Sequence, residues 1–209
     1  MTAMILAAGR GERMRPLTDV KPKPLIEVRG KPLIVWHLEK LARNGFKNVV
    51  INIAHLGFMI PEVLGDGSKW GVEIVYSDEQ GIGALESAGG IINALEHLSE
   101  EFLVVNADVW CDYEFNNSFS LNDKLAHLIL VENPEHNKDG DFEYKNDKYT
   151  FSGIGYYSKK MFKNLSKQKL ALAPILRKSI ENNEVSFELY KGEWRDIGTP
   201  QRLEEINDR

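Results

Sequence analysis

The sequence predicts an α/β fold built around a mainly parallel β-sheet. Over residues 1–110, short β-branched runs alternate with longer segments of helical period, which is the pattern of consecutive βαβ units. The apolar runs have strand length, and none approaches the roughly 18 residues that a membrane-spanning helix needs. The chain has 209 residues, of which 43% are hydrophobic and 27% charged, so it can bury a full core.

The first half of the chain is expected to form four strands with helices between them. Residues 4–8 are the first strand, and a glycine- and proline-rich loop follows from Gly9 to Pro24. A helix opens at Pro32 and stops near Asn44 and Gly45. Further strands are predicted at residues 48–53, 72–76 and 102–106. Their apolar composition predicts burial on both faces, as in a parallel sheet.

The regular alternation of predicted strands and helices changes after residue 111. Residues 126–131 are a predicted strand, and residues 142–144 and 149–157 flank a polar tetrapeptide, which is the pattern of a β-hairpin. A helix is expected at 174–182, a strand at 185–189 and a closing helix from Pro200. No internal repeat or Ser/Pro-rich linker is visible, so we expect one domain spanning residues 1–209.

Charge and cysteine content exclude several classes of protein. Lysine and arginine total 26 against 31 acidic residues, a formal charge of −5, so the chain lacks the basic excess of non-specific nucleic-acid binders. The single cysteine, Cys111, cannot form an intrachain disulfide, and no Cys/His spacing suggests a zinc site. We expect a protein of the reducing cytoplasm, without membrane or nucleic-acid partners.

The loop after the first strand carries the strongest chemical pattern. Small residues at Ala7, Ala8, Gly9 and Gly11 let backbone N–H groups approach an anion, and a run of arginines and lysines supplies positive charge. This combination favours a cradle for a nucleoside triphosphate. It is not a Walker A loop, and as a dinucleotide fingerprint it lacks the third glycine, because Met14 holds that place. The alternative is a glycine turn with solvated arginines.

The residues carry a family resemblance. The run LAAGRGERMRPLT followed by PKPL is similar to the signature of sugar-phosphate nucleotidyltransferases, which join a nucleoside triphosphate and a sugar 1-phosphate. Residues 87–90, 106–109 and 194–199 extend the resemblance over most of the chain. The segments NADVWCDYEF, NPEHNKDGDF and FSGIGYYS most resemble the subgroup of N-acetylmuramate-1-phosphate uridylyltransferases.

The resemblance implies a fold and a division of the chain. It implies a Rossmann-like three-layer sandwich with a mixed, mainly parallel sheet, of the nucleotide-diphospho-sugar transferase type. Residues 1–110 then form a nucleotide-binding half and residues 111–209 a sugar-binding half. It also implies Mg²⁺, held by Asp108 and Asp196. Two carboxylates with few other ligands suit Mg²⁺, although a lone aspartate at a strand end is more often a cap or turn former.

The resemblance also assigns the nucleotide side. Arg13 is expected to grip the triphosphate and Lys23 to lie against the α-phosphate or the incoming phosphate, which makes both catalytic, with Arg15 and Lys21 as second choices. The base is expected to be read from the first loop and from the turn before residue 90, with Gln80 or Glu86 adding a side-chain contact. The predicted nucleotide-binding residues are Ala8, Gly9, Gly11, Glu12, Arg13, Lys23, Glu86, Ser87 and Gly89. The alternative for Ser87 is a helix cap.

On the sugar side, the candidates are turn-forming or strand-end residues. Asn106 is expected to contact the phosphate or an N-acetyl group, and Asp141 the sugar hydroxyls. The predicted sugar-binding residues are Asn106, Gly140, Asp141, Ser152 and Gly153. Each also fits a purely structural turn role.

The expected activity is the transfer of UMP from UTP to N-acetyl-α-muramate 1-phosphate, giving UDP-N-acetylmuramate and pyrophosphate in peptidoglycan recycling. The alternatives are the same chemistry on mannose 1-phosphate with GTP, or on glucose 1-phosphate with UTP or dTTP. A non-catalytic nucleotide-sugar-binding regulatory subunit is the alternative of another class. The expected partners are the small-molecule substrates, and the sequence leaves open a monomer or a dimer.

Overall fold

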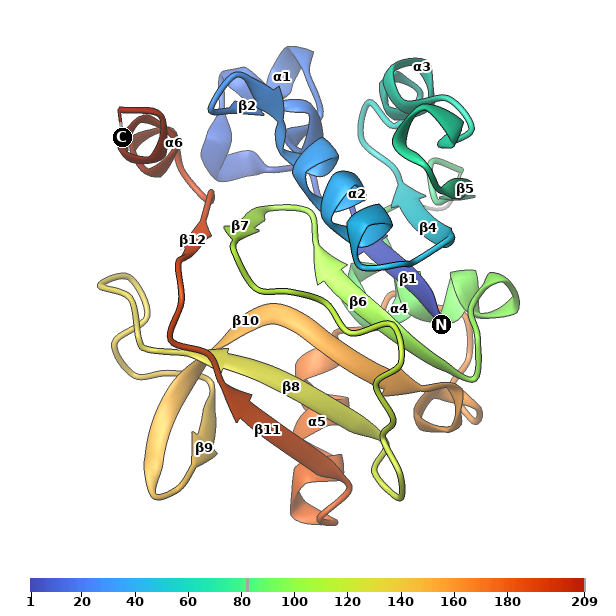
Figure 1. Ribbon diagram of the computed structural model, residues 1–209, viewed down its shortest axis with the longest axis vertical. Helices are drawn as coiled ribbons and strands as arrows, with labels where there is room; N and C mark the ends of the chain where they lie inside the picture. Colours follow the sequence, from blue (N-terminus) through green and yellow to red (C-terminus); the bar gives the residue numbers. More distant parts are fainter. Residues whose placement is uncertain (82, 209) are drawn as a thin grey trace.

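A computed structural model describes residues 1–81 and 83–208, and a mixed sheet dominates it (Figure 1). In spatial order its strands are β11 (Val185–Leu189), β8 (Ala126–Val131), β10 (Asp147–Ser158), β6 (Glu101–Asn106), β1 (Thr2–Leu6), β4 (Asn48–Ile53) and β5 (Glu73–Asp78). Neighbouring strands pair in parallel except that β10 runs antiparallel to both β6 and β8. The predicted mixed, mainly parallel sheet is confirmed.

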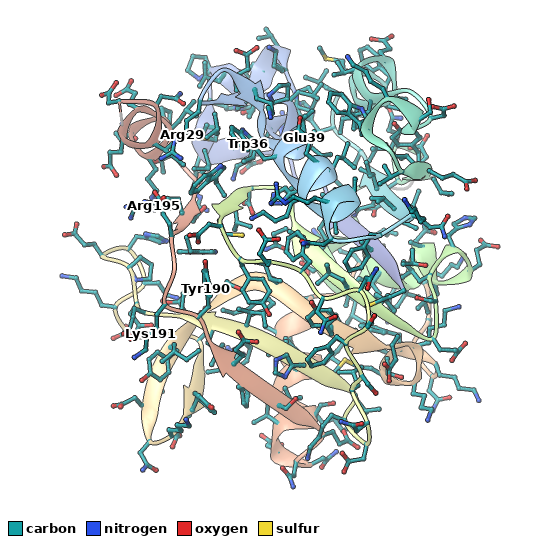
Figure 2. All side chains as sticks on the ribbon, viewed as in Figure 1. Arg29, Trp36, Glu39, Tyr190, Lys191 and Arg195 are labelled. Carbon is teal, nitrogen blue, oxygen red and sulfur yellow. The ribbon has the colours of Figure 1, made fainter. Side chains whose placement is uncertain are left out.

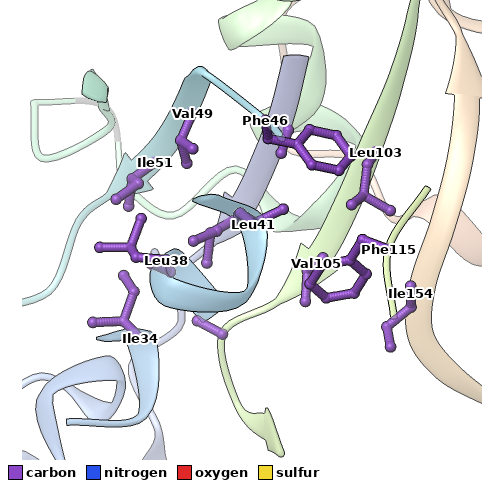
Figure 3. Packing of buried hydrophobic residues seen from close by; sticks show 14 of the residues in the cluster. Ile34, Leu38, Leu41, Phe46, Val49, Ile51, Leu103, Val105, Phe115 and Ile154 are labelled. Carbon is purple, nitrogen blue, oxygen red and sulfur yellow. The ribbon is translucent and has the colours of Figure 1, made fainter. Parts of the chain in front are cut away.

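Helices cover the sheet on both faces, which makes the expected three layers. In β1, Ala3 and Ile5 face one hydrophobic cluster, shared with α2 (Leu33–Arg43), and Met4 faces another, shared with α4 (Glu86–Ala94) and α5 (Leu172–Glu181). This division follows from the two-residue period of a strand. Figure 3 shows the first cluster, in which Leu38 of α2 lies among the side chains that β4 and its neighbours direct toward the helix.

Shorter elements complete the chain. They are α1 (Leu17–Val20), β2 (Glu27–Val28), β3 (Lys31–Pro32), α3 (Met59–Leu64), β7 (Val109–Cys111), β9 (Phe142–Tyr144), β12 (Trp194–Asp196) and α6 (Pro200–Asn207), with 3-10 turns at Glu12–Met14, Lys23–Leu25, Ser68–Trp70, Leu95–His97 and Lys159–Phe162. The long segment from Gly9 to Pro24 is therefore folded into single turns rather than extended loop.

The predicted hairpin is confirmed in β9 and β10. Its turn residues Lys145 and Asn146 have φ of 53° and 71°, the left-handed pair that suits the twist of a two-residue β-turn. Further along, β10 shifts register between Phe151 and Ile154, which marks a β-bulge. Gly153 lies in this bulge with φ of 79°, next to the side chain of Asn106.

Two expectations about the strands were wrong. The first strand ends at Leu6 rather than Ala8, because the N–H of Ala7 donates to the side chain of Asn52, at 2.8 Å from Oδ1, rather than to the backbone of a neighbouring strand. The strand predicted at residues 72–76 is the edge strand β5, which pairs on one side alone and is only partly buried. Burial on both faces holds for the interior strands.

The two ends of the chain meet in a third, smaller hydrophobic cluster. Met14 and Val28 from the N-terminal segment pack there with Trp110, and Ile197 and Ile206 join them from the C-terminal segment. Arg29 and Trp36 lie beside it, to the right of α6 in Figure 2, with the Arg29 guanidinium 4.5 Å from the Trp110 ring centroid. This packing holds β12 against β7, so the C-terminal residues reach the end of β6.

In the part of the chain that the structure describes, every helix is too short or too polar to cross a membrane.

We predict that Gly153→Ala lowers both stability and activity. An added Cβ would lie 2.7 Å from Asn106 Nδ2 and about as close to its Cβ and Cγ, and φ of 79° disfavours any L side chain. We expect a loss of about 2–4 kcal/mol in the free energy of unfolding, from backbone strain and overpacking together. Urea denaturation measures this loss. Gly30→Ala is the matched control, because φ there is 74° with no heavy atom within 4 Å of the added Cβ. An equal loss in both variants would contradict the clash with Asn106.

Candidate functional site

A cavity of about 520 Å³ opens at the carboxyl ends of β1, β4 and β6. Because β4 and β6 pair with opposite edges of β1, the chains leaving these strands diverge, and open α/β sheets bind ligands at such a switch point. The described residues that line the cavity are Leu6, Ala7, Ala8, Gly9, Arg10, Gly11, Glu12, Arg13, Lys23, Pro24, Asn52, Ala84, Glu86, Ser87, Asn106, Ala107, Asp108 and Gly198.

The first loop folds through its own hydrogen bonds. Gly11 has φ of 67°, and its carbonyl oxygen accepts from Thr18 Oγ1 at 2.8 Å and from the N–H of Met14 at 2.9 Å. A Cβ at Gly11 would lie 2.9 Å from Thr18 and 3.2 Å from Lys23, so only glycine fits at this position. The loop therefore lines the cavity with backbone, as the small residues of the sequence predict.

The two cations predicted to be catalytic line this cavity, and the second choices do not. Lys23 is 8% exposed, and its Nζ donates to Asp108 Oδ2 at 2.8 Å. Arg13 lies on the loop wall. Arg15 instead pairs with Asp19 at 2.9 Å on the exposed side, and Lys21 lies outside the lining. Ion pairing with Asp108 offsets part of the cost of burying the Lys23 charge.

Asp196 faces a second cavity, of about 820 Å³. One of its carboxylate oxygens accepts from the Arg202 guanidinium and lies 3.2 Å from His136 Nε2. Tyr190, Lys191 and Arg195 line the same cavity from the segment that joins β11 to α6 (Figure 2). The side chains of Asp108 and Asp196 therefore line different cavities.

The backbones of these two aspartates are nevertheless neighbours. Strand β12 pairs antiparallel with β7, so that Asp196 lies opposite Val109, and the N–H of Ile197 donates to the carbonyl of Asp108 at 2.9 Å. The β7–β12 ribbon thus separates the two cavities and carries one carboxylate toward each. In residues 1–81 and 83–208 no cluster of three or more His, Cys, Asp or Glu side chains suits a metal ion.

On the opposite wall, the start of α4 agrees with expectation at Ser87 and differs at Gly89. Ser87 lines the cavity from the first turn, and its alternative role as the helix cap does not hold, because Leu85 occupies the N-cap position. Gly89 is not part of the cavity lining, because it lies where α4 meets the segment before α5, and an added Cβ would be 2.3 Å from the Gln168 carbonyl. Glu86 does line the cavity, with a left-handed φ of 62° that favours glycine.

Of the predicted sugar-binding residues, Asn106 is the one that lines the first cavity. Asp141 Oδ2 accepts from the N–H of Phe151 at 2.8 Å, and Ser152 Oγ donates to the Ile129 carbonyl at 2.7 Å. Gly140 packs against the backbone of β10, and Gly153 lies behind Asn106. The structure therefore gives these residues roles within the sheet, which is the alternative that the sequence left open.

Two buried polar residues near the cavity were not predicted from the sequence. Asn52 is 3% exposed and Glu79 is 1% exposed, and they bond to each other at 2.8 Å. Burial raises the pKa of the Glu79 carboxyl, and its hydrogen bonds with Leu85 and Asn52 oppose the shift. A polar residue inside the apolar run of residues 49–53 was the available signal for Asn52. Gln80, which the sequence offered alongside Glu86 as a contact for the base, is exposed and bonds to Asp78.

His37 lies beneath the strand that follows Asp108. It is 2% exposed on α2, and burial, together with the charge of Lys40, lowers its pKa to about 4. A hydrogen bond to the backbone of Val109 opposes that shift. His37 is therefore neutral at physiological pH and supports the backbone of β7.

Sequence comparison identifies the family. A family profile described as nucleotidyl transferase matches residues 2–140. The chain belongs to the nucleotidyl transferase family. One curated family member, the N-acetylmuramate alpha-1-phosphate uridylyltransferase of Neisseria meningitidis serogroup B, is 51% identical over 98% of this chain and 96% of its own length. A UTP–glucose-1-phosphate uridylyltransferase of Synechocystis is 37% identical over 63% of this chain and 36% of its own.

Solved structures of other nucleotidyl transferases share the fold. A putative glucose-1-phosphate thymidylyltransferase from Bacillus anthracis superposes with a TM-score of 0.86 at 21% identity, covering 100% of this chain and 94% of its own. The CTP:phosphocholine cytidylyltransferase of Streptococcus pneumoniae gives 0.76 at 22% identity, covering 99% and 97%. The predicted nucleotide-diphospho-sugar transferase fold is thereby confirmed.

We predict that His37 makes this nucleotidyl transferase less stable in mild acid. The unfolded chain binds a proton at a pKa near 6.5, whereas folded His37 has a pKa of about 4, so stability is full above about pH 6.5 and falls as the pH drops toward 4. Between about pH 7 and pH 5 this histidine alone removes roughly 2 kcal/mol.

Urea denaturation at the two pH values measures the effect. His37→Gln should show a smaller decrease than the wild type, and His97→Gln, at an exposed position, should match the wild type. An unchanged pH dependence in His37→Gln would contradict the burial of a neutral ring.

Proposed function

We propose that the protein transfers UMP from UTP to N-acetyl-α-muramate 1-phosphate, releasing pyrophosphate and forming UDP-N-acetylmuramate. The observation that carries the proposal is the 51% identity, over nearly the whole of both chains, with a relative named for this activity. A cavity of suitable chemistry supports it, because the glycine-rich loop, Arg13 and Lys23 lie at the sheet's switch point. The proposal places the reaction in the cytoplasm, as a step that returns recovered wall sugar to peptidoglycan synthesis.

The reaction needs positioning and charge stabilisation rather than a general base. The attacking oxygen of a sugar 1-phosphate is already anionic, so the protein must align it with the α-phosphorus and offset the negative charge around it. Arg13 is assigned to the triphosphate and the departing pyrophosphate. Lys23 is assigned to the α-phosphate, and its contact with Asp108 fixes the position of its ammonium group.

Asp108 and Asp196 are assigned to Mg²⁺. Their donor set fits, because Mg²⁺ accepts one or two carboxylates and completes its shell with water and phosphate oxygens. The two residues are neighbours only through the paired backbones of β7 and β12, and their carboxylates line different cavities, so an ion held by both would require these side chains to turn toward each other. When bound, Mg²⁺ neutralises phosphate charge. Lys23 contacts Asp108, and Arg202 with His136 contacts Asp196, so these carboxylates would exchange protein ion pairs for the metal when it binds.

We predict that a pyrophosphate-release assay finds UTP with N-acetylmuramate 1-phosphate to be the best substrate pair. The panel crosses UTP, dTTP, GTP and CTP with the 1-phosphates of N-acetylmuramate, N-acetylglucosamine, glucose and mannose. We expect kcat/KM for the favoured pair to exceed every other by at least about tenfold, a difference of about 1.4 kcal/mol in transition-state binding. No release from this pair would refute the proposal, and release from another pair would assign the protein to that reaction.

We predict that Asp108→Asn and Asp196→Asn each lower kcat by on the order of 100-fold, since each removes a charge that the metal requires. Chelation of divalent ions should abolish wild-type turnover, and added Mg²⁺ should restore it. Asp66→Asn is the control, because Asp66 lies in an exposed turn outside both cavities and should keep wild-type rates. Wild-type rates in both variants would refute the metal assignment.

A further inference from the structure

Three hydrogen bonds join the two walls of the first cavity through buried side chains. The N–H of Ala7 donates to Asn52 Oδ1, Asn52 Nδ2 donates to Glu79 Oε1, and the N–H of Leu85 donates to Glu79 Oε2, each at 2.8 Å. Ala7 is the first residue after β1 and leads into the glycine-rich loop from Gly9 to Pro24, which the proposed function makes the phosphate loop. Leu85 is the N-cap of α4. The three hydrogen bonds therefore connect one wall of the cavity to the other.

The polarity of these bonds requires one amide and one carboxylate. Both backbone ends are N–H donors, so the outer side-chain atom at each end must be an acceptor. Asn52 accepts at one end and donates at the other, and Glu79 accepts at both. A buried polar group without its partner costs more than the bond itself contributes, so each member depends on the next.

Packing leaves this pair no freedom to move. An added Cβ at Gly90 of α4 would lie 2.7 Å from Asn52 Nδ2 and 2.8 Å from Glu79 Oε1. With both of its oxygens bonded and 1% of the residue exposed, Glu79 does not line the cavity, although Asn52 does. Both oxygens of its carboxylate are therefore hydrogen-bonded within the protein, so Glu79 affects the cavity only through Asn52 and Leu85.

We propose that Asn52 and Glu79 are positioning residues that set the separation between the phosphate loop and the start of α4, and thereby the affinity for the nucleoside triphosphate. This inference rests on the proposed function in that a nucleotide occupies the first cavity. The proposed function assigns the acceptor sugar phosphate to the side of the cavity lined by Asn106 and Asp108, so its binding should depend less on this separation.

The test exchanges the two functional groups. In Glu79→Gln an amide N–H₂ faces a donor, and in Asn52→Asp two carboxylates face each other. In the double variant Asn52→Asp with Glu79→Gln, residue 52 still accepts from Ala7, residue 79 still accepts from Leu85, and the middle bond reverses its direction. The double variant therefore restores all three hydrogen bonds and the total charge while keeping both side-chain shapes.

We expect each single variant to raise the Kd and KM for UTP by at least about tenfold, with KM for the sugar phosphate within about twofold of wild type. The double variant should return the UTP values to within about threefold of wild type. Calorimetric titration and initial rates measure these quantities, and thermal unfolding shows which variants are folded at the assay temperature. Wild-type UTP affinity in folded single variants, or no recovery in the double variant, would overturn the proposal.

Gly90→Ala provides the same test if a single variant does not fold. Its methyl group presses on both side chains, and alanine suits the helix, so we expect the same selective increase in KM for UTP. Gly81→Ala, where the added Cβ has no heavy atom within 4 Å, is the control. Unchanged UTP affinity in Gly90→Ala would count against the proposal.

Failure of the proposed function is distinguishable. A wild-type protein that binds GTP instead of UTP refutes uridylyl transfer alone, and the same variants then test the positioning pair with GTP. A wild-type protein that binds no nucleoside triphosphate refutes both.

Discussion

The position of β1 between β4 and β6 is the constraint on which the site depends. Hydrogen bonds on both edges fix this strand in the interior of the sheet, and the strands that follow it in the sequence pair on opposite sides of it. The segments that leave the three strands must therefore diverge, and they leave a cleft over the end of β1. The glycine-rich loop follows β1 directly, so its backbone lines that cleft whatever else the chain does.

Charge compensation is the second organising feature. Lys23 is nearly buried and Arg202 lies beside the site, although the chain carries a net charge of −5. Each cation is paired with an aspartate of the β7–β12 ribbon, which limits the cost of placing charge away from water. The same groups that stabilise the ribbon are those assigned to phosphate and metal. In the proposed reaction, substrate binding exchanges protein ion pairs for contacts to phosphate and metal.

Much of the fold could be predicted from local sequence patterns, because interactions between residues close in the sequence determine it. The period of apolar residues located the interior strands. The polar tetrapeptide located the hairpin, because a short turn is determined by the backbone conformations of its own residues, here the left-handed Lys145 and Asn146. The glycine-rich loop could be predicted for the same reason, since Gly11 and Lys23 lie in one continuous segment. Strand β7 and the Asn52–Glu79 pair were missed: the first is too short for a period, and the second joins residues 27 positions apart.

The sequence by itself determined the fold class, the glycine-rich loop with its cations, and the resemblance that led to the family. These depend on side-chain period, backbone conformation and motif, which neighbouring residues carry. Only the tertiary structure decided that Gly89 packs against a distant segment, that Asp141 and Ser152 are committed to the sheet, and that Asp196 pairs with Arg202. A polar side chain has several possible partners, and the choice depends on which distant groups packing brings within hydrogen-bond distance.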